Sequence, residues 1–289
     1  MPYLFILLAD VLLAGSFIYQ KKYQQNCGES IRAGILFNLL TGVFGCVILF
    51  IMNGFKVETT AFSVFMATLQ TVLVVAYTMI SFRILKTSNL SLYTLFLMTG
   101  GMILPYIFGL AFLGEPFSIA KTIGLVLITV AIVLSNKVIK VNIKEQIFLL
   151  ILVFIINGMT SIVSKVHQID ISHNPIDSNS FAFWVCVTKV IICLAIYPFI
   201  KSTGEKSEKI SLKLPVMIII ILASVCSNVS YLFQLMGAKD VPATILYPLV
   251  TGGSIILTTL CGATFLKEKP DKRQIVGIII CFIGTCLFV

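Results

Sequence analysis

The chain has 289 residues, of which 58% are hydrophobic and only 11% are charged. A soluble domain carries about 25% charged residues and cannot bury so large an apolar fraction, and a disordered chain needs low hydrophobicity. The composition therefore excludes both classes and indicates an integral membrane protein. The net charge of +9 then reports on orientation, because Lys and Arg collect in short cytoplasmic loops of membrane proteins. We expect no binding to nucleic acid.

Ten apolar stretches follow one another along the chain. A helix that crosses a bilayer needs about 20 mostly apolar residues. The predicted spans are Pro2–Gln20, Ile31–Met52, Ala61–Arg83, Leu92–Leu113, Ser118–Asn136, Glu145–Lys165, Ser180–Ile200, Pro215–Gly237, Val241–Phe265 and Lys272–Val289. Only short connections remain between them, so the sequence predicts an all-α integral membrane protein without a soluble domain.

The two halves of the chain carry matching blocks. Thr99–Gly101 returns as Thr251–Gly253 at an offset of 152. Phe112–Glu115 and Ile123–Leu125 return as Phe265–Glu268 and Val276–Ile278, both at an offset of 153. The first and sixth predicted spans also align, at an offset of 144. Three blocks in the same order predict two copies of a five-helix unit.

An odd number of helices in each copy has a mechanical consequence. The second copy must enter the membrane from the opposite side, so residues 1–140 and 141–289 are predicted to form two inverted five-helix repeats around a central cavity. Inverted repeats of this kind are typical of transporters that work by alternating access. A duplicated membrane scaffold that transports nothing is the structural alternative.

These motifs resemble the drug/metabolite transporter superfamily, in its ten-helix EamA-like branch. The similar pieces are the helix ends Gly15…Lys21 and Gly158…Lys165, the two Phe-Leu-x-Glu turns, and the glycines Gly124 and Gly277. The resemblance covers the whole chain and implies a basket of ten helices that moves amino acids, nucleosides, other metabolites or drugs. The second turn departs from the first by carrying Lys267 where the first has Gly114.

The basic residues divide unevenly between the two ends of the predicted bundle. Of the 21 Lys and Arg, 16 lie near the end away from the chain termini and four near the terminal end, while Lys189 lies mid-helix. This bias predicts that the 16 face the cytoplasm. We therefore expect a multi-pass protein of the cell membrane with both termini extracytoplasmic, opposite to the usual orientation of the family.

Two charged residues lie near the middle of predicted spans, Asp10 in the first and Lys189 in the seventh. A lone charge at mid-bilayer costs about 2.5–3.5 kcal/mol on insertion scales, so each needs a wet cavity or a partner. One interpretation makes Asp10 a cavity carboxylate that binds a cationic group or exchanges a proton. The other pairs Asp10 with Lys189 as structural glue.

Further polar, aromatic and helix-breaking residues complete the candidate site. The remaining candidates for the cavity lining are Asn38, Tyr77, Trp184, Asn228, Tyr231 and Tyr247. The candidates for kinks and gating are Pro105 and Pro248 with the pairs Gly100–Gly101 and Gly252–Gly253. For Gln70, Asn157 and Gln234 we favour helix-to-helix hydrogen bonds. Glu115 and Glu268 are expected to cap the helix that follows each.

No enzyme site is predicted. The two histidines, His167 and His173, are expected in one solvated loop, and the eight cysteines have no metal-site spacing. The predicted function is a secondary transporter of a small polar or amphipathic organic solute, such as an amino acid, nucleoside, amine or drug-like metabolite. Its expected partners are the solute, the bilayer and protons, as a monomer or homodimer without cofactor or metal. The alternatives are a translocator of a lipid or lipid-linked carrier, a channel, a scaffold and a membrane enzyme.

Overall fold

A computed structural model describes residues 2–28, 30–87, 90–135, 147–200, 213–265 and 271–288, and the side chains of all of these except 81–87 and 90–92. The helices are α1 Pro2–Cys27, α2 Ile31–Met52, α3 Ala61–Thr87, α4 Leu90–Phe112, α5 Ile119–Ser135, α6 Ile147–Ile169, α7 Ser178–Ile196, the short η2 Tyr197–Phe199, α8 Leu214–Asp240, α9 Ala243–Phe265 and α10 Lys272–Cys286. Within these ranges the prediction of an all-helical chain with ten long helices is confirmed.

Eight of the described helices are long and apolar enough to cross a membrane. The other two are shorter, with 17 residues in α5 and 15 in α10. Large apolar side chains cover the outside of the bundle; for example, Leu7 is 58% exposed and Phe282 is 59% exposed. Lipid tails can cover such a surface, whereas water cannot without a large cost.

Several helices run past the ends that hydropathy predicts. The first continues from Gln20 to Cys27, which was expected in a loop, because Tyr23 is buried against Phe37 and its hydroxyl donates to the carbonyl of Ala33 at 3.0 Å. The sixth continues from Lys165 to Ile169. An apolar window ends at the first polar residues, but the backbone hydrogen bonds of a helix continue wherever the next turn still packs.

Polar caps begin three of the helices. The side chain of Ser30 accepts from the backbone N–H of Ala33 at the start of α2, and Asp177 accepts from Ser180 at the start of α7. Asp271 and Gln274 form a reciprocal capping box at α10. Each cap satisfies N–H groups that a helix end leaves without an intrahelical partner.

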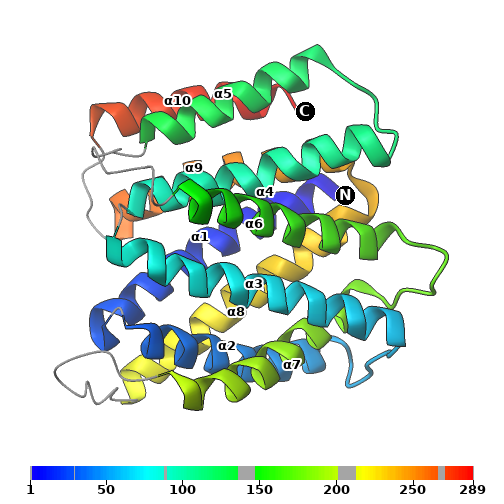
Figure 1. Ribbon diagram of the computed structural model, residues 1–289, viewed down its shortest axis with the longest axis vertical. Helices are drawn as coiled ribbons and strands as arrows, with labels where there is room; N and C mark the ends of the chain where they lie inside the picture. Colours follow the sequence, from blue (N-terminus) through cyan, green and yellow to red (C-terminus); the bar gives the residue numbers. More distant parts are fainter. Residues whose placement is uncertain are drawn as a thin grey trace.

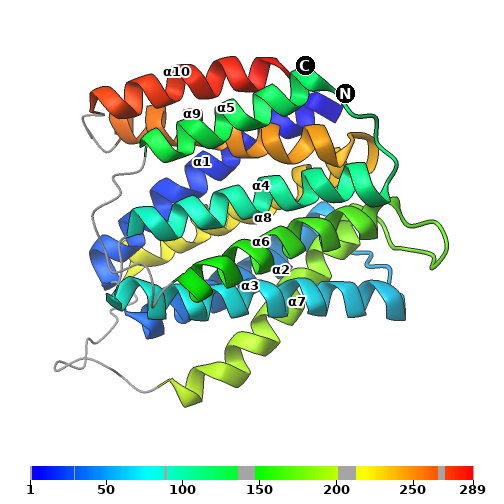
Figure 2. The same ribbon diagram turned by 45° about the horizontal axis from the view of Figure 1, so that its top comes forward.

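The bundle has two helix pairs at its ends and a core of six helices between them. In Figures 1 and 2, α5 and α10 lie side by side at the top, and α2 and α7 lie near the bottom. Between them, α1 packs on α8 and α9, α4 packs on α6 and α9, and α3 packs on α6 and α7. Both chain termini lie at the same end of the bundle as the connection between α6 and α7 (Figure 1).

Candidate functional site

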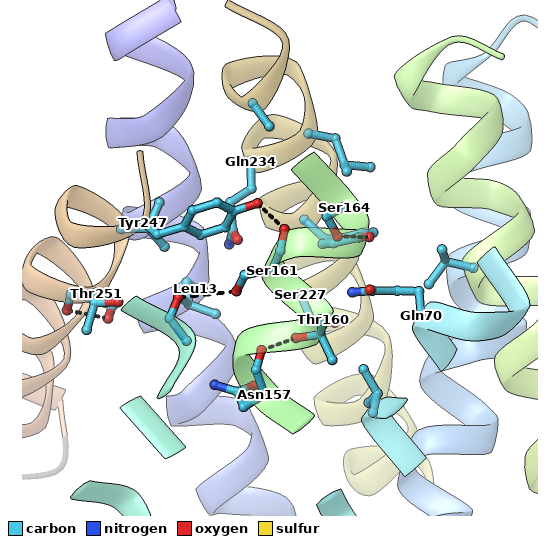
Figure 3. A pocket seen from close by; sticks show the side chains of 18 of the residues that line it. Leu13, Gln70, Asn157, Thr160, Ser161, Ser164, Ser227, Gln234, Tyr247 and Thr251 are labelled. Carbon is cyan, nitrogen blue, oxygen red and sulfur yellow. Dashed lines mark hydrogen bonds between the residues drawn. The ribbon is translucent and has the colours of Figure 1, made fainter. Parts of the chain in front are cut away.

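A pocket of about 400 Å³ lies among α1, α3, α4, α6, α7, α8 and α9 (Figure 3). Its apolar lining comes from residues such as Leu13, Phe17 and Val250. Its polar lining consists of Gln70, Tyr77, Asn157, Thr160, Ser161, Ser164, Lys189, Ser227, Asn228, Tyr231, Gln234, Tyr247, Thr251 and Ser254. Ligand pockets of small organic molecules commonly have this size and this mixture of apolar walls with a few polar groups.

Hydrogen bonds to helix backbones hold several of the polar side chains in place. The Asn157 amide donates to the carbonyl of Leu97 at 2.7 Å, which ties α6 to α4. The Asn228 amide donates to the carbonyls of Thr41 at 3.1 Å and Ser224 at 2.9 Å. These two amides therefore act partly as the interhelical links that are common in membrane proteins.

Gln70 differs from those two amides. Its side chain is only 5% exposed, and its Oε1 has no hydrogen-bond partner among the described residues. Figure 3 shows the side chain reaching from α3 toward the α6 and α8 residues of the pocket. A buried acceptor without a partner costs free energy, so a pocket water or a bound molecule is the expected donor.

A cluster of polar contacts links the connection between α4 and α5 with α6, α8 and α9, at the end of the bundle where the termini lie. The ammonium of Lys165, which is 4% exposed, donates to the carbonyls of Ala238 at 2.6 Å and Val241 at 2.7 Å. The carboxylate of Glu115 accepts from the backbone N–H groups of Ala243 at 2.6 Å and Thr244 at 2.8 Å. A cation at the C-terminus of α8 and an anion at the N-terminus of α9 both complement the helix dipoles.

Two tyrosine hydroxyls extend this cluster into the pocket. Tyr247 donates to the carbonyl of Ser161, and Tyr231 forms a hydrogen bond of 2.9 Å with Ser164. Glu115 was expected to cap the helix that follows it. The structure instead has it capping α9, which is a long-range contact that no local sequence rule reveals. Its expected counterpart Glu268, with Lys267, lies outside the described residues.

Asp10 lies beside the pocket and not on its lining. The residue is 4% exposed, and its carboxylate packs against Gly253, where a Cβ atom would overlap Oδ2. Its Oδ1 has no hydrogen-bond partner among the described residues, and no ion pair joins it to Lys189. Lys189 lines the pocket from α7, so the structure does not bring the two charged candidates together.

The other candidates divide between the pocket and its surroundings. The lining includes Tyr77, Asn228, Tyr231, Tyr247 and Gly101. Asn38 instead lines a smaller pocket of about 60 Å³ between α2, α3 and α7, which also contains Lys189. Trp184 contacts neither pocket, and its indole N–H donates to the carbonyl of Glu58 at 3.1 Å.

The glycine and proline candidates lie in α4 and α9. Pro105 and Pro248 lie inside these helices, which continue through them. A Cβ on Gly100 would overlap the backbone of Phe154 in α6, and one on Gly252 would overlap Thr285 in α10. Close packing at these positions thus requires the absence of a side chain.

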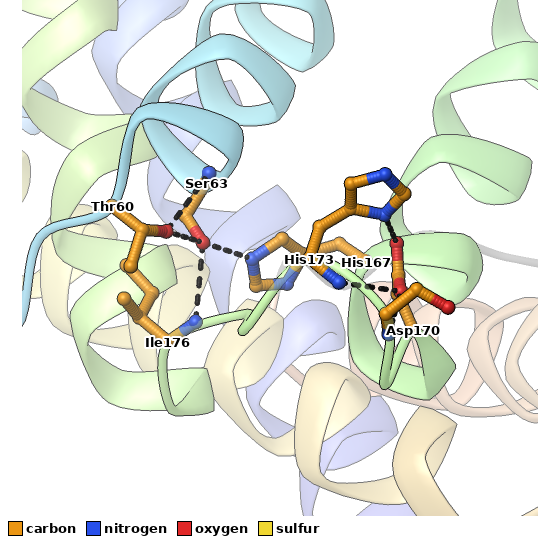
Figure 4. A network of polar contacts seen from close by, with 7 residues as sticks. Thr60, Ser63, His167, Asp170, His173 and Ile176 are labelled. Carbon is orange, nitrogen blue, oxygen red and sulfur yellow. Dashed lines mark hydrogen bonds and ion pairs between the residues drawn. The ribbon is translucent and has the colours of Figure 1, made fainter.

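The position of His167 corrects the sequence prediction. The residue lies in α6 and is fully buried, stacked on Phe181 with a ring separation of 3.7 Å. Its Nε2 lies 2.9 Å from the hydroxyl of Ser63, which also accepts from the backbone N–H of Ile176 at 3.1 Å (Figure 4). The loop prediction failed because the helix continues one turn past Lys165 and the imidazole replaces an apolar side chain in the packing.

His173 does lie in the connection after α6, as expected. Its Nδ1 is 2.8 Å from Oδ2 of Asp170 (Figure 4). This hydrogen bond, together with one from the backbone N–H of Ser172, lowers the pKa of Asp170. The pair is a surface feature of the connection between α6 and α7.

Sequence reasoning missed the small hydroxyl side chains of the pocket. Thr160, Ser161, Ser164, Ser227, Thr251 and Ser254 all line it. Ser and Thr are frequent in membrane helices, where they bond to the carbonyl three or four residues earlier, as Thr160 does to Asn157 at 2.6 Å. Their number alone therefore carries no signal, and only their shared face on packed helices shows the site.

Comparisons with known proteins agree with this architecture. The sequence profile of the EamA-like transporter family matches residues 145–289. A crystal structure of another protein is similar over 98% of this chain and 94% of its own, with a TM-score of 0.75 at 14% sequence identity, which shows a shared fold. None of the curated proteins matches. Because the profile covers half of the chain and the structural likeness extends over nearly all of it, the chain belongs to the EamA-like transporter family of the drug/metabolite transporter superfamily.

Proposed function

We propose that this protein is a secondary transporter that moves a small polar or amphipathic organic solute by exposing one pocket to the two membrane faces in turn. Family membership implies membrane transport. The observation that carries the proposal is the pocket itself, which combines polar groups from helices of both halves of the chain. Seven helices line the pocket, so movement of these helices relative to one another can change the access of solute to it.

The pattern of helix packing supports the two inverted repeats, 1–140 and 141–289. The proposed repeats make counterparts of α1 and α6, α2 and α7, α3 and α8, α4 and α9, and α5 and α10. When every helix is replaced by its counterpart, the pair α1–α8 becomes α6–α3, α4–α6 becomes α9–α1, and α2–α8 becomes α7–α3. All six of these pairs pack together. The pairs α5–α10, α2–α7 and α4–α9 also pack and convert into themselves. Such exchange is what a pseudo-two-fold axis in the membrane plane produces.

The glycine pairs support the same relation. Sequence alignment of the repeats matches Asp10 with Phe154 and Gly253 with Gly101. The side chain of Asp10 packs against Gly253, and the backbone of Phe154 packs against Gly100, the neighbour of the aligned glycine. The two contacts lie at the α1–α9 and α4–α6 interfaces, which are exchanged by the repeat operation.

The cluster of Lys165, Glu115 and Tyr247 supports a state closed at the end where the termini lie. These side chains connect α6, α8 and α9 with the connection between α4 and α5, between the pocket and the turn that joins α8 to α9. In this proposal the pocket communicates with the opposite end, which carries most of the basic residues and faces the cytoplasm. Opening of the terminal end then requires the cluster to separate, with Pro105 and Pro248 providing bending points in α4 and α9.

Uptake into proteoliposomes tests the function directly. Vesicles that contain the purified protein are incubated with a defined mixture of labelled small metabolites, and accumulated compounds are identified by mass spectrometry. Saturable uptake that exceeds that of protein-free vesicles supports a solute transporter. Reorientation of fluorescent lipids without solute uptake contradicts it and favours the lipid translocator.

A further inference from the structure

We infer that the transported solute is a small organic carboxylate that also carries hydroxyl or N–H donors, recognised at two points by Lys189 and Gln70. This inference rests on the proposed transport function and deepens it. It reverses the expectation that the pocket selects a cation through Asp10, whose carboxylate faces Gly253.

Lys189 is the single charged side chain among the described residues of the pocket lining. It also lines the smaller pocket with Val74, so its side chain lies where the two pockets meet. The aliphatic part of the Lys189 side chain passes α2 at Gly42, where a Cβ added to the glycine would be 3.6 Å from Cδ of Lys189. Within the described part of the chain the ammonium makes no hydrogen bond or ion pair, although a charge inside a membrane protein normally has a partner.

Gln70 supplies the second, independent observation. It is buried, it lines the same pocket, and its Oε1 lacks a donor among the described residues. An amide oxygen accepts hydrogen bonds only, so the missing partner must carry an O–H or N–H group. An apolar solute, or an acid without further donors, offers this atom no hydrogen bond and leaves it to a pocket water.

A hydrogen bond between neighbouring residues brings Lys189 and Gln70 to the same depth. The hydroxyl of Thr71 lies 2.7 Å from that of Thr188, and both threonines are buried. Gln70 directly precedes Thr71 in α3, and Lys189 directly follows Thr188 in α7. The two helices pack against each other. The register of these helices therefore places the two residues at a similar depth in the lining of the pocket.

The chemistry of this pair selects for charge and for donors together. An ammonium forms short, strong hydrogen bonds with a carboxylate, and a low-dielectric pocket strengthens them. No acidic side chain of the described lining offsets Lys189, so a cationic solute is repelled. A hydroxy or amino carboxylate satisfies the ammonium and the amide oxygen simultaneously.

Ligand-induced stabilisation of the purified full-length protein tests the inference. The probes are hydroxy, amino and sugar carboxylates, each paired with its primary amide and with the corresponding acid that lacks the donor group, together with amines of similar size. We expect carboxylates with donors to raise the melting temperature most. Stabilisation by the amides or amines to the same degree, or by no carboxylate at millimolar concentration, would overturn the inference.

Three variants assign the effect to the two residues. Lys189→Gln should weaken binding of the best carboxylate about tenfold or more, the effect of losing one charge-assisted hydrogen bond. Gln70→Met should retain the preference for carboxylate over amide but lose the preference for acids with donors. Lys239→Gln, which removes an exposed lysine outside the pocket, is the matched control and should bind normally. Unchanged binding by Lys189→Gln, with a wild-type melting temperature without ligand, would contradict the assignment.

The two proposals fail in different ways. Binding of a carboxylate through Lys189 without any uptake of that compound into proteoliposomes would refute transport and leave the recognition site standing. Saturable uptake of an amine or a neutral solute, unaffected by Lys189→Gln, would refute the recognition site and leave transport standing.

Discussion

Asp10 of α1 has a buried carboxylate that packs against Gly253 of α9. One of its oxygens, Oδ1, has no hydrogen-bond partner among the described residues. The contact is close enough that any side chain at position 253 would displace it. Because the residue borders the pocket through Leu13, one turn further along α1, a change in its protonation can affect the α1–α9 interface without contact with solute. We therefore propose that Asp10 couples transport to protons and does not itself recognise the solute.

Asp10→Asn keeps the shape of the side chain and removes its titration. We expect the variant to fold but to lose the stimulation of solute uptake by an imposed pH gradient, because no group at this interface then changes charge. Uptake into proteoliposomes over a pH series measures the effect, with Glu58→Gln at an exposed position as control. Gradient stimulation equal to that of the wild type would refute this role.

Individual residues were only partly predictable from the sequence. The buried charges Asp10 and Lys189 stand out in any apolar helix, but the sequence does not tell which of them reaches the pocket. Gln70 belongs to a group of amides for which helix-to-helix bonding was the favoured interpretation, and its unpartnered oxygen is visible only once α3 and α7 are packed. Orientation about a helix axis is decided by tertiary contacts.

At the scale of helices, glycines determine how closely α4 and α6 approach. A Cβ on Gly100 would overlap the carbonyl oxygen of Phe154, which is backbone and cannot rotate away. A Cβ on Gly15 would be 3.3 Å from the Cys226 sulfur, which needs only a small shift. The two positions therefore differ in what substitution costs.

Gly100→Ala should destabilise the protein by about 1–3 kcal/mol, the usual effect of overpacking. Gly15→Ala is the matched control and should change stability much less. Thermal unfolding of the two purified variants measures the difference. Equal melting temperatures would contradict the close α4–α6 contact.

The Glu115 cap connects the corner between α4 and α5 to the start of α9. Glu115→Gln should weaken the hydrogen bonds to Ala243 and Thr244 by about 1 kcal/mol, as loss of a good N-terminal cap does. Hydrogen exchange of peptides that span the turn between α8 and α9 should then accelerate about fivefold. Glu58→Gln is the control, and unchanged exchange in Glu115→Gln would show that the cap does not hold this turn.

The order and number of the helices were predicted from apolar length alone, because lipid imposes that length on every span. Helix ends were less accurate, as at Cys27 and Ile169, because terminal turns depend on local packing. The contact of Glu115 with α9 joins parts of the chain 128 residues apart. No spacing rule within one repeat anticipates it.

At the scale of the whole molecule, the two inverted repeats that we propose give a simple account of transport. Two halves with opposite orientation can exchange their conformations, so the closed cluster at one end implies a related closure at the other. In this proposal the pocket binds solute from either face, and the direction of net transport follows the gradients across the membrane.

Sidedness of one helix tests this account most directly. In a variant that lacks the eight native cysteines, single cysteines replace Lys213 and Lys239, near the two ends of α8, and Ser227 in the pocket between them. A membrane-impermeant thiol reagent is applied to oriented cells and inverted vesicles. We predict that Lys213→Cys reacts only from the cytoplasm and Lys239→Cys only from outside. Ser227→Cys should react mainly from the cytoplasm. When Glu115→Gln is combined with Ser227→Cys, the cysteine should also react from outside. Equal reactivity of Ser227→Cys from both faces without that change, or from neither face in any variant, would contradict alternating access to a shared pocket.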